Sequence, residues 1–332
     1  MIDLTVIWAG IIGFAVVAYV VMDGFDLGIG ILFPRFRVGP ERDTAMNSIA
    51  PVWDGNETWL VLGGGGLMAA FPLAYAIVLP ALYAPLIAML LGLVLRGVAF
   101  EFRWRDPAHR PIWDLSFTLG SIVATFAQGV TLGALLQGIT VEGRAYAGGW
   151  WEWLSLFSCL TGLGLIIGYA LLGACWLIWK TEGPLQDQAY RYASRLGFAL
   201  LAVIALVSLA TLRLEAQYYQ HWLSWPGILA TSQVPLATLI VSILFFRSVR
   251  RRQEAAPFFY VLGLFGLCFV GLGVSIWPDV IPARVSIWAA AAPESSQIFM
   301  LVGAGILVPI ILAYTGWAYW VFRGKVGAEG YH

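Results

Sequence analysis

Long apolar segments, separated by short polar ones, follow each other along the whole chain. Runs of more than about eighteen apolar residues are typical of α-helices that cross a membrane. The pattern predicts nine such helices, at about residues 6–33, 51–71, 74–100, 112–137, 151–179, 196–212, 226–246, 258–277 and 298–322. The predicted fold class is therefore an all-α polytopic membrane protein.

Prolines and loop lengths refine this prediction. Pro80 and Pro85 fall inside the third predicted helix and should kink it. The predicted loops are short, and none is long enough for a separate soluble domain. Residues 1–332 are therefore expected to form a single integral membrane domain.

The composition supports the same class. Hydrophobic residues make up 60% of the chain and charged residues 11%, whereas a soluble domain carries about 25% charged residues. The formal net charge is zero, which gives no electrostatic reason to expect a nucleic acid as partner.

The positions of the basic residues predict how the helices are oriented. All but three of the 19 Lys and Arg residues fall in segments on one side of the predicted membrane, and the exceptions are Arg144, Arg213 and Arg284. Basic residues accumulate in cytoplasmic loops. We therefore expect the N-terminus outside the cell and the C-terminus in the cytoplasm.

A short polar stretch at the start of the second predicted helix contains candidate functional residues. Asp54, Asn56 and Glu57 lie in it, and Asp23 and Asp26 lie near the end of the preceding helix. Residues three apart share a helix face, and ionisable residues inside a membrane are expensive unless they are functional or fully paired. Neighbouring carboxylates in a low-dielectric setting cannot all stay ionised, so the stretch is a candidate mouth for proton uptake from the cytoplasm.

A structural alternative carries equal weight from the residue chemistry alone. Asp54 and Asn56 would then cap the second helix, while Asp23, Asp26 and Arg96 would form ion pairs at the level of the lipid headgroups.

The positions of the histidines give no reason to expect a haem bound by this chain. Only His109, His221 and His332 are present, each in a predicted loop or at the terminus, and no CxxCH motif occurs. Haem between membrane helices needs axial His or Met ligands, and methionines in helices are more often plain packing. We therefore expect no haem or metal ligated by this chain, which leaves a transporter and an enzyme subunit as possible classes.

Several motifs resemble subunit II of the cytochrome bd-type quinol oxidases. They are MID at residues 1–3, DGFDLG at 23–28, NSIAPVWDGNETW at 47–59, RGVAFE at 96–101 and VPIILAYT at 308–315. The likeness covers the whole chain. Glu57 stands where some members of the family have an amide, and Glu101 where some have Asp.

The resemblance implies a partner subunit I that carries the b- and d-type haems, oxidises quinol and reduces O2 to water, in a prokaryotic plasma (inner) membrane. It also implies that subunit II contributes to a cytoplasmic proton channel, and it allows a structural quinone in this chain and a small single-helix third subunit. We expect nine helices arranged as two four-helix bundles plus one additional helix.

Carried to this sequence, the resemblance makes Asp54 the first candidate for a proton-route carboxylate. Trp53 would line the route and Asp26 would be a second carboxylate, while no catalytic residue is expected in this chain. The remaining candidates are Glu57 and Asp23 on the route and Asn56, Arg96 and Glu101 in a supporting polar cluster.

Two other functions stay open at this point. A proton-coupled secondary transporter would use the same acids in an alternating-access mechanism, and it would need no haem-bearing partner. A purely structural subunit would only assemble and insulate subunit I.

Overall fold

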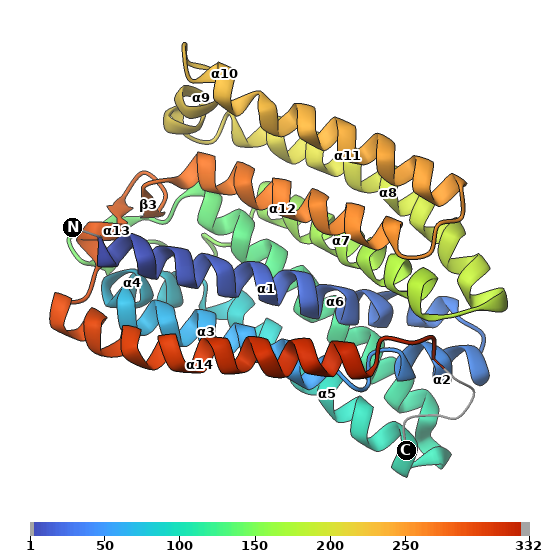
Figure 1. Cartoon of the computed structure of the whole chain (residues 1–332). Helices are drawn as coiled ribbons and strands as arrows, with labels where there is room; N and C mark the ends of the chain where they lie inside the picture. The colour runs from blue at the N-terminus through green and yellow to red at the C-terminus, as the bar shows by residue number, and fades with distance from the viewer. Residues whose placement is uncertain (1–2, 327–332) are drawn as a thin grey trace.

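The computed structural model describes residues 3–326 and is almost entirely helical (Figure 1). Met1 and Ile2 of the first motif and His332 lie outside the described residues. The helices are α1 Leu4–Leu32, α2 Pro40–Asn47, α3 Trp53–Ala70, α4 Pro72–Ala81, α5 Tyr83–Arg105, α6 Arg110–Gln137, α7 Leu156–Lys180, α8 Gly183–Thr211, α9 Ala216–Leu223, α10 Ile228–Thr231, α11 Gln233–Arg250, α12 Ala256–Ile276, α13 Ile287–Ala290 and α14 Glu294–Val321. Short 3-10 helices cover Phe33–Arg35 and Pro107–His109.

Two small antiparallel hairpins complete the structure, β1 Val141–Glu142 with β2 Ala145–Tyr146 and β3 Asp279–Ile281 with β4 Val285–Ser286. Within residues 3–326, eight helices are long and apolar enough to cross a membrane, or nine if α3 and α4 form one broken span. The prediction of an all-α membrane protein with about nine spans is therefore confirmed. The grouping into two four-helix bundles plus one helix stays a prediction.

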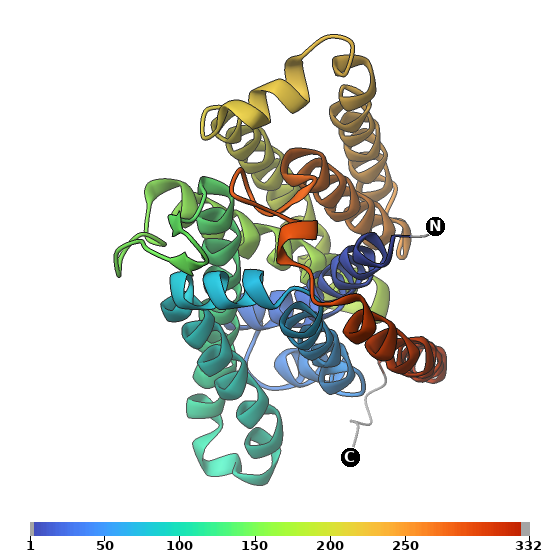
Figure 2. The ribbon, with the colours of Figure 1, turned by 90° about the vertical axis from the view of Figure 1, so that its left-hand side faces the viewer.

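The third predicted helix is wrong as a continuous element. Residues 72–105 form two helices, α4 and α5, with a break at Leu82, and α4 bends by 120° from α3 so that it lies across one end of the bundle (Figure 2). Pro85 falls in the first turn of α5, where a missing N–H costs nothing because it would have no helical partner. The ten residues of α4 reach only about 15 Å, too short to cross a membrane.

The centre of the bundle is the crossing of α1 and α7. A Cβ atom on Gly28 would lie 1.8 Å from the backbone oxygen of Tyr169, and one on Gly173 would lie 2.5 Å from the carbonyl carbon of Gly28. Glycine at both positions lets the two backbones touch. Around this crossing pack Phe25, Leu27 and Ile29, all at most 2% exposed.

The last helix lies on the outside of the bundle. In α14 only Gln297 is buried, so nearly all of its apolar surface faces outward. Beyond its end, Lys325 donates a hydrogen bond to the carbonyl oxygen of Thr181 and forms an ion pair with Glu254, both at 3.0 Å. The hydrogen bond from Lys325 holds the pKa of Glu254 below its ordinary value. The end of α14 is thereby tied to the ends of α7 and α11.

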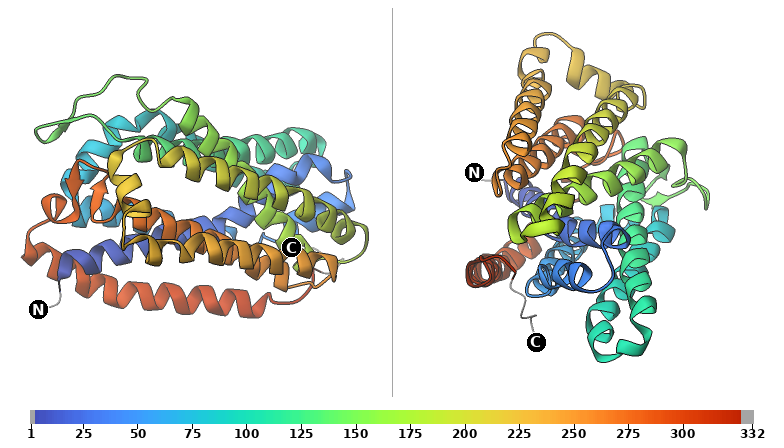
Figure 3. Two further views of the ribbon diagram at one scale, coloured as in Figure 1. Left: turned by 90° about the horizontal axis from the view of Figure 1, so that it is seen from above. Right: turned by 90° about the vertical axis from the view of Figure 1, so that its right-hand side faces the viewer.

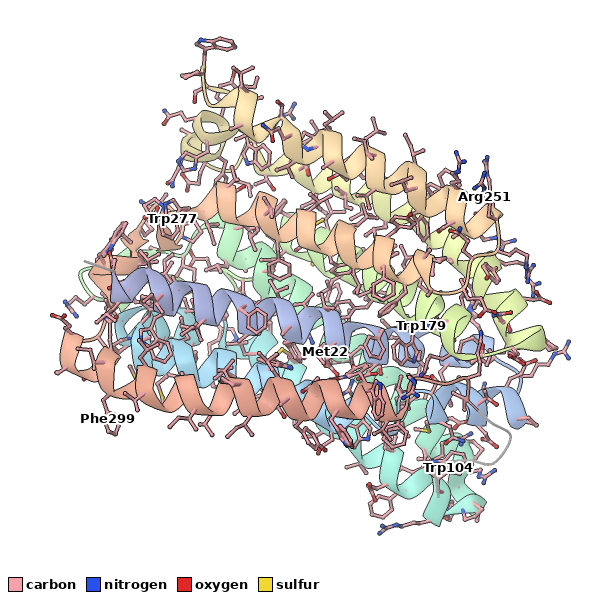
Figure 4. The ribbon with its side chains drawn as sticks, in the orientation of Figure 1. Met22, Trp104, Trp179, Arg251, Trp277 and Phe299 are labelled. Atoms are coloured by element: carbon pink, nitrogen blue, oxygen red, sulfur yellow. The ribbon has the colours of Figure 1, made fainter. Side chains whose placement is uncertain are left out.

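The two ends of the bundle differ in charge. Arg251 lies at the same end as Trp104 and Trp179, and Trp277 lies at the opposite end (Figure 4). The first end carries the arginine-rich segments around α2, the start of α8 and the end of α11, and we refer to it as the arginine-rich end.

Candidate functional site

Three of the predicted site residues meet in a buried ion-pair cluster near the arginine-rich end. Arg96 of α5 donates from Nη1 to Oδ1 of Asp23 on α1 at 2.6 Å, and from Nη2 to Oε1 of Glu57 on α3. The side chains of Arg96 and Asp23 are at most 1% exposed, whereas that of Glu57 is 28% exposed. One guanidinium therefore joins three helices, and only Glu57 faces outward.

Aromatic rings hold the guanidinium in place. The ring of Trp53 lies 5.8 Å from the Arg96 guanidinium carbon, and it stacks on Phe100 at 4.7 Å between ring centroids with nearly parallel planes. A cation over the face of a tryptophan ring is stabilised by the ring quadrupole. Trp53 therefore fixes the position of Arg96 as well as covering the cluster.

The second carboxylate of α1 has a different partner. Asp26 accepts a hydrogen bond from Nδ2 of Asn56 at 2.7 Å, and Tyr319 of α14 donates its hydroxyl to Oδ1 of Asn56 at 3.0 Å. Asn56 also donates to the carbonyl oxygen of Met22 at 3.2 Å. Although Asp23 and Asp26 are three residues apart, one meets a guanidinium and the other a neutral amide.

Asp54 lies outside the buried cluster, on the exposed surface of α3. It occupies the first turn of α3, is exposed, and its side chain makes no hydrogen bond or ion pair within residues 3–326. The residue before the helix is Val52, whose side chain cannot cap. The capping role that the structural alternative gave to Asp54 and Asn56 is therefore wrong, because Asn56 bonds to α1 and Asp54 points outward. The ion pair between Asp23 and Arg96 in that alternative is present.

The charges of the cluster do not balance. Asp23, Asp26 and Glu57 surround the single guanidinium of Arg96, and each aspartate keeps one buried oxygen without a hydrogen-bond partner in the described chain, Oδ2 of Asp23 and Oδ1 of Asp26. An unpaired buried oxygen is costly unless another group or a proton satisfies it.

A second buried cluster nearby has balanced charges. Arg103 pairs with Asp43 at 2.8 Å and with Asp114 at 2.6 Å, and Arg42 pairs with Asp114 at 2.7 Å. Two cations here meet two anions, and the cluster ties α2 to α5 and α6. This is the pattern of a structural network, whereas the Arg96 cluster has more acids than bases.

Glu101 is not part of the Arg96 cluster. Its side chain is 60% exposed and pairs with Arg105 one turn further along α5 at 3.3 Å. The prediction that Glu101 supports the polar cluster is therefore wrong, since positions 96 and 101 are five apart and point in different directions around the helix.

A polar chain that the sequence analysis missed continues from the cluster into the bundle. Gln128 of α6 donates to the hydroxyl of Tyr19 at 2.8 Å and accepts from the hydroxyl of Tyr169 at 2.9 Å. Tyr19 lies four residues before Asp23, on the same face of α1. That spacing is the one sequence signal by which Tyr19 could have been found. Tyr319 was not predicted either, because it lies far from Asn56 in the sequence.

The two histidines among the described residues both have polar partners. Within the described residues, His109 is bonded to Asp106 at 2.9 Å outside the bundle, and His221 contacts the carbonyl oxygen of Ser275 at the opposite end. Within residues 3–326, no group of three His, Cys, Asp or Glu side chains is placed to hold a metal ion.

Comparisons with known proteins identify the family of the chain. Residues 4–322 match the family described as cytochrome bd terminal oxidase subunit II. The chain is 29% identical over 364 residues to cytochrome bd-I ubiquinol oxidase subunit 2 of Escherichia coli strain K12, covering 97% of this chain and 95% of the relative. It is also 29% identical over 337 residues to cytochrome bd ubiquinol oxidase subunit 2 of Bacillus subtilis strain 168, covering 96% of both.

The fold has a counterpart among solved structures. A chain of the bd oxidase from Geobacillus thermodenitrificans superposes with a TM-score of 0.78 at 17% identity, covering 97% of this chain and 100% of that one. The match of the family over nearly the full length, together with this fold, places the chain in the cytochrome bd oxidase subunit II family, as a multi-pass membrane subunit of an oxidoreductase complex.

Proposed function

We propose that this chain takes up protons from the cytoplasm and passes them toward a haem-bearing subunit I, which would use them to reduce O2 to water. The observation that carries the proposal is the surplus of carboxylates around Arg96, which opens outward at Glu57 and Asp54. If Asp23, Asp26 and Glu57 were all ionised, the cluster would hold a net charge of −2, and keeping that charge in a largely buried cluster is costly. Binding and releasing a proton changes this charge.

The roles follow from exposure. Asp54 is accessible and would collect protons, and Glu57, one turn further along α3, is partly exposed and would receive them. Asp23 and Asp26 lie deeper, each with an unpaired oxygen that can carry a proton. Arg96 and Asn56 would hold these acids apart, and Trp53 would cover the cluster.

An exposed stripe along α3, beginning at Asp54, is a candidate contact surface for a partner subunit. Residues that recur at helical spacing stay exposed along one face, namely Asp54, Thr58, Val61, Gly65 and Met68. We propose that subunit I covers this stripe, so that Asp54 lies at the subunit boundary. The haems b and d, the quinol site and O2 reduction would all belong to that partner.

The arginine-rich end would face the cytoplasm. Basic residues accumulate in cytoplasmic loops, and the cluster lies in that half of the bundle. With this orientation, protons consumed in making water come from the cytoplasm, and charge is separated without a pump. The chain would lie in the plasma membrane of a prokaryote.

The test is the replacement Asp54→Asn in the complex purified through a tag on this chain. We expect bands of b- and d-type haem at the wild-type level, while quinol-dependent O2 uptake falls by about 10²-fold, the lower range for the loss of a positioned proton-transferring group. The matched control is Glu101→Gln, which removes an exposed carboxylate at the same end and should leave turnover unchanged.

Three results would contradict the proposal. Full turnover in Asp54→Asn would remove this residue from the proton route. Loss of haem together with turnover would favour a purely structural subunit. A gently extracted preparation without any haem-bearing partner would favour the proton-coupled transporter.

A further inference from the structure

A basic pocket lies at the arginine-rich end between α8 and α11, away from the proton site. It is an open hollow of about 530 Å³, lined from α8 by Asp187, Tyr190, Arg191 and Ser194, and from the end of α11 and the residues just after it by Val249, Arg250 and Arg252. These two helices form the opposite flank of the bundle from α5 and α6 (Figure 3). The pocket therefore has no part in the Arg96 cluster.

The pocket carries surplus positive charge. Arg252 forms an ion pair with Asp187, which uses the only acidic side chain in the lining. Arg191 and Arg250 are exposed, and neither side chain makes a hydrogen bond or ion pair within residues 3–326. Two guanidinium groups are thus free to bind an anion, and the Ser194 hydroxyl and Tyr190 lie between the two helices that carry them.

Arg252, one of the residues that line the pocket, has a strained backbone conformation. Its φ is +52°, in the left-handed region that favours glycine at a helix end. The amide of Gln253 bonds to the carbonyl oxygen of Ser248, which closes the end of α11. The Arg252 guanidinium lies 4.5 Å from the centre of the Tyr190 ring. Arginine rarely adopts this conformation, and strained residues of this kind cluster at functional sites such as ligand-binding sites.

An apolar surface continues directly below the pocket. One turn deeper, Phe198 of α8 stacks on Phe246 of α11 with 4.2 Å between ring centroids. Phe198 is 60% exposed, and Leu239 and Ile243 on α11 are each 57% exposed. A charged cavity above exposed apolar side chains matches a molecule with an anionic head and hydrocarbon tails.

We propose that this pocket binds the phosphodiester headgroup of an anionic phospholipid. Arg191 and Arg250 would bind the phosphate oxygens, since guanidinium groups match phosphate geometry. Basic pockets between membrane helices on the cytoplasmic side bind such headgroups. The acyl chains would lie along Phe198 and Ile243. This inference does not depend on the proton role of the Arg96 cluster.

The experiment is native mass spectrometry of the delipidated complex, purified through a tag on this chain and titrated with phosphatidylglycerol. We expect the double variant Arg191→Gln with Arg250→Gln to bind this lipid roughly 30-fold more weakly, about 5-fold for each arginine lost. Arg191→Lys with Arg250→Lys keeps the charge but not the guanidinium geometry, so it should bind more tightly than the glutamine variant, which separates lost charge from misfolding.

The matched control is Arg251→Gln. Arg251 is exposed beside the pocket at the end of α11 but does not line it (Figure 4), so this variant should bind like the wild type. The proposal is overturned if Arg251→Gln weakens binding as much as the double variant does. It is also overturned if phosphatidylcholine binds as tightly as phosphatidylglycerol, or if millimolar inorganic phosphate displaces the lipid and so identifies a soluble anion as the occupant.

Discussion

At the scale of single residues, Arg96 determines the site. Its guanidinium has no exposed surface and pairs with two carboxylates from two other helices. Removing one partner of a buried pair leaves an uncompensated charge, and this is far more damaging than losing an exposed pair.

We therefore predict that Arg96→Met destabilises the protein by about 3–5 kcal/mol. The measurement is thermal unfolding of the purified complex. The control on the same helix is Arg105→Met, which removes an exposed partner of Glu101 and should change stability by less than about 1 kcal/mol.

A second variant tests the physical reason for this loss. In Arg96→Met with Asp23→Leu, both members of the most deeply buried pair are replaced by apolar groups, and part of the stability should return. Equal stability of Arg96→Met and the wild type would show that the cluster is already solvated, and the account of its buried charge would then be wrong.

The charged residues of the site were predictable from the sequence, but the pairing among them was not. The acids and Arg96 could be identified because charged residues near membrane segments are rare. Their partners could not, because the choice between Arg96 and Asn56 for Asp23 and Asp26 depends on how α3 and α5 pack against α1. Tyr319 reaches Asn56 from 263 positions away.

At the scale of elements, the α1–α7 crossing is the most constrained contact. Gly28 and Gly173 face each other with no room for a side chain between the backbones. Small residues allow such contact in membranes, where helix association relies on packing because lipid is as apolar as the side chains.

The replacement Gly28→Ala should therefore separate the two helices. Overpacking typically costs about 1–3 kcal/mol, and contact with backbone rather than with a flexible side chain places this variant at the upper end. Yield and melting temperature of the complex measure the effect. Gly13→Ala on the same helix meets nothing within 4 Å and is the control. Identical melting temperatures for the two variants would contradict the importance of the crossing.

The break between α4 and α5 could not be predicted from the hydrophobic pattern. The apolar run from 74 to 100 is continuous in sequence and predicts one kinked helix. The hydropathy of a segment does not say whether it crosses a membrane or lies across its end. The packing of α4 against β2 and α13 resolves this, since these elements gather at the end of the bundle opposite to the arginine-rich one.

At the scale of the whole molecule, the asymmetry of charge predicts the orientation in the membrane. Arg144 lies in the β1–β2 hairpin at one end and Arg251 at the other, and both are exposed. We expect a membrane-impermeant maleimide to label Arg144→Cys in intact cells and to leave Arg251→Cys unlabelled until the cells are broken. The reverse pattern would place the proton site on the outer face and would remove cytoplasmic uptake.

The sequence alone determined the class, the approximate spans, the family and the identity of the charged candidates. These properties depend on hydropathy, on the cost of charge in lipid and on local motifs, which are all readable along the chain. Only the tertiary structure decided which carboxylate meets Arg96, that Glu101 stands apart, and that Arg191 and Arg250 share a pocket. Such pairings arise where helices distant in sequence touch, and no local pattern records them.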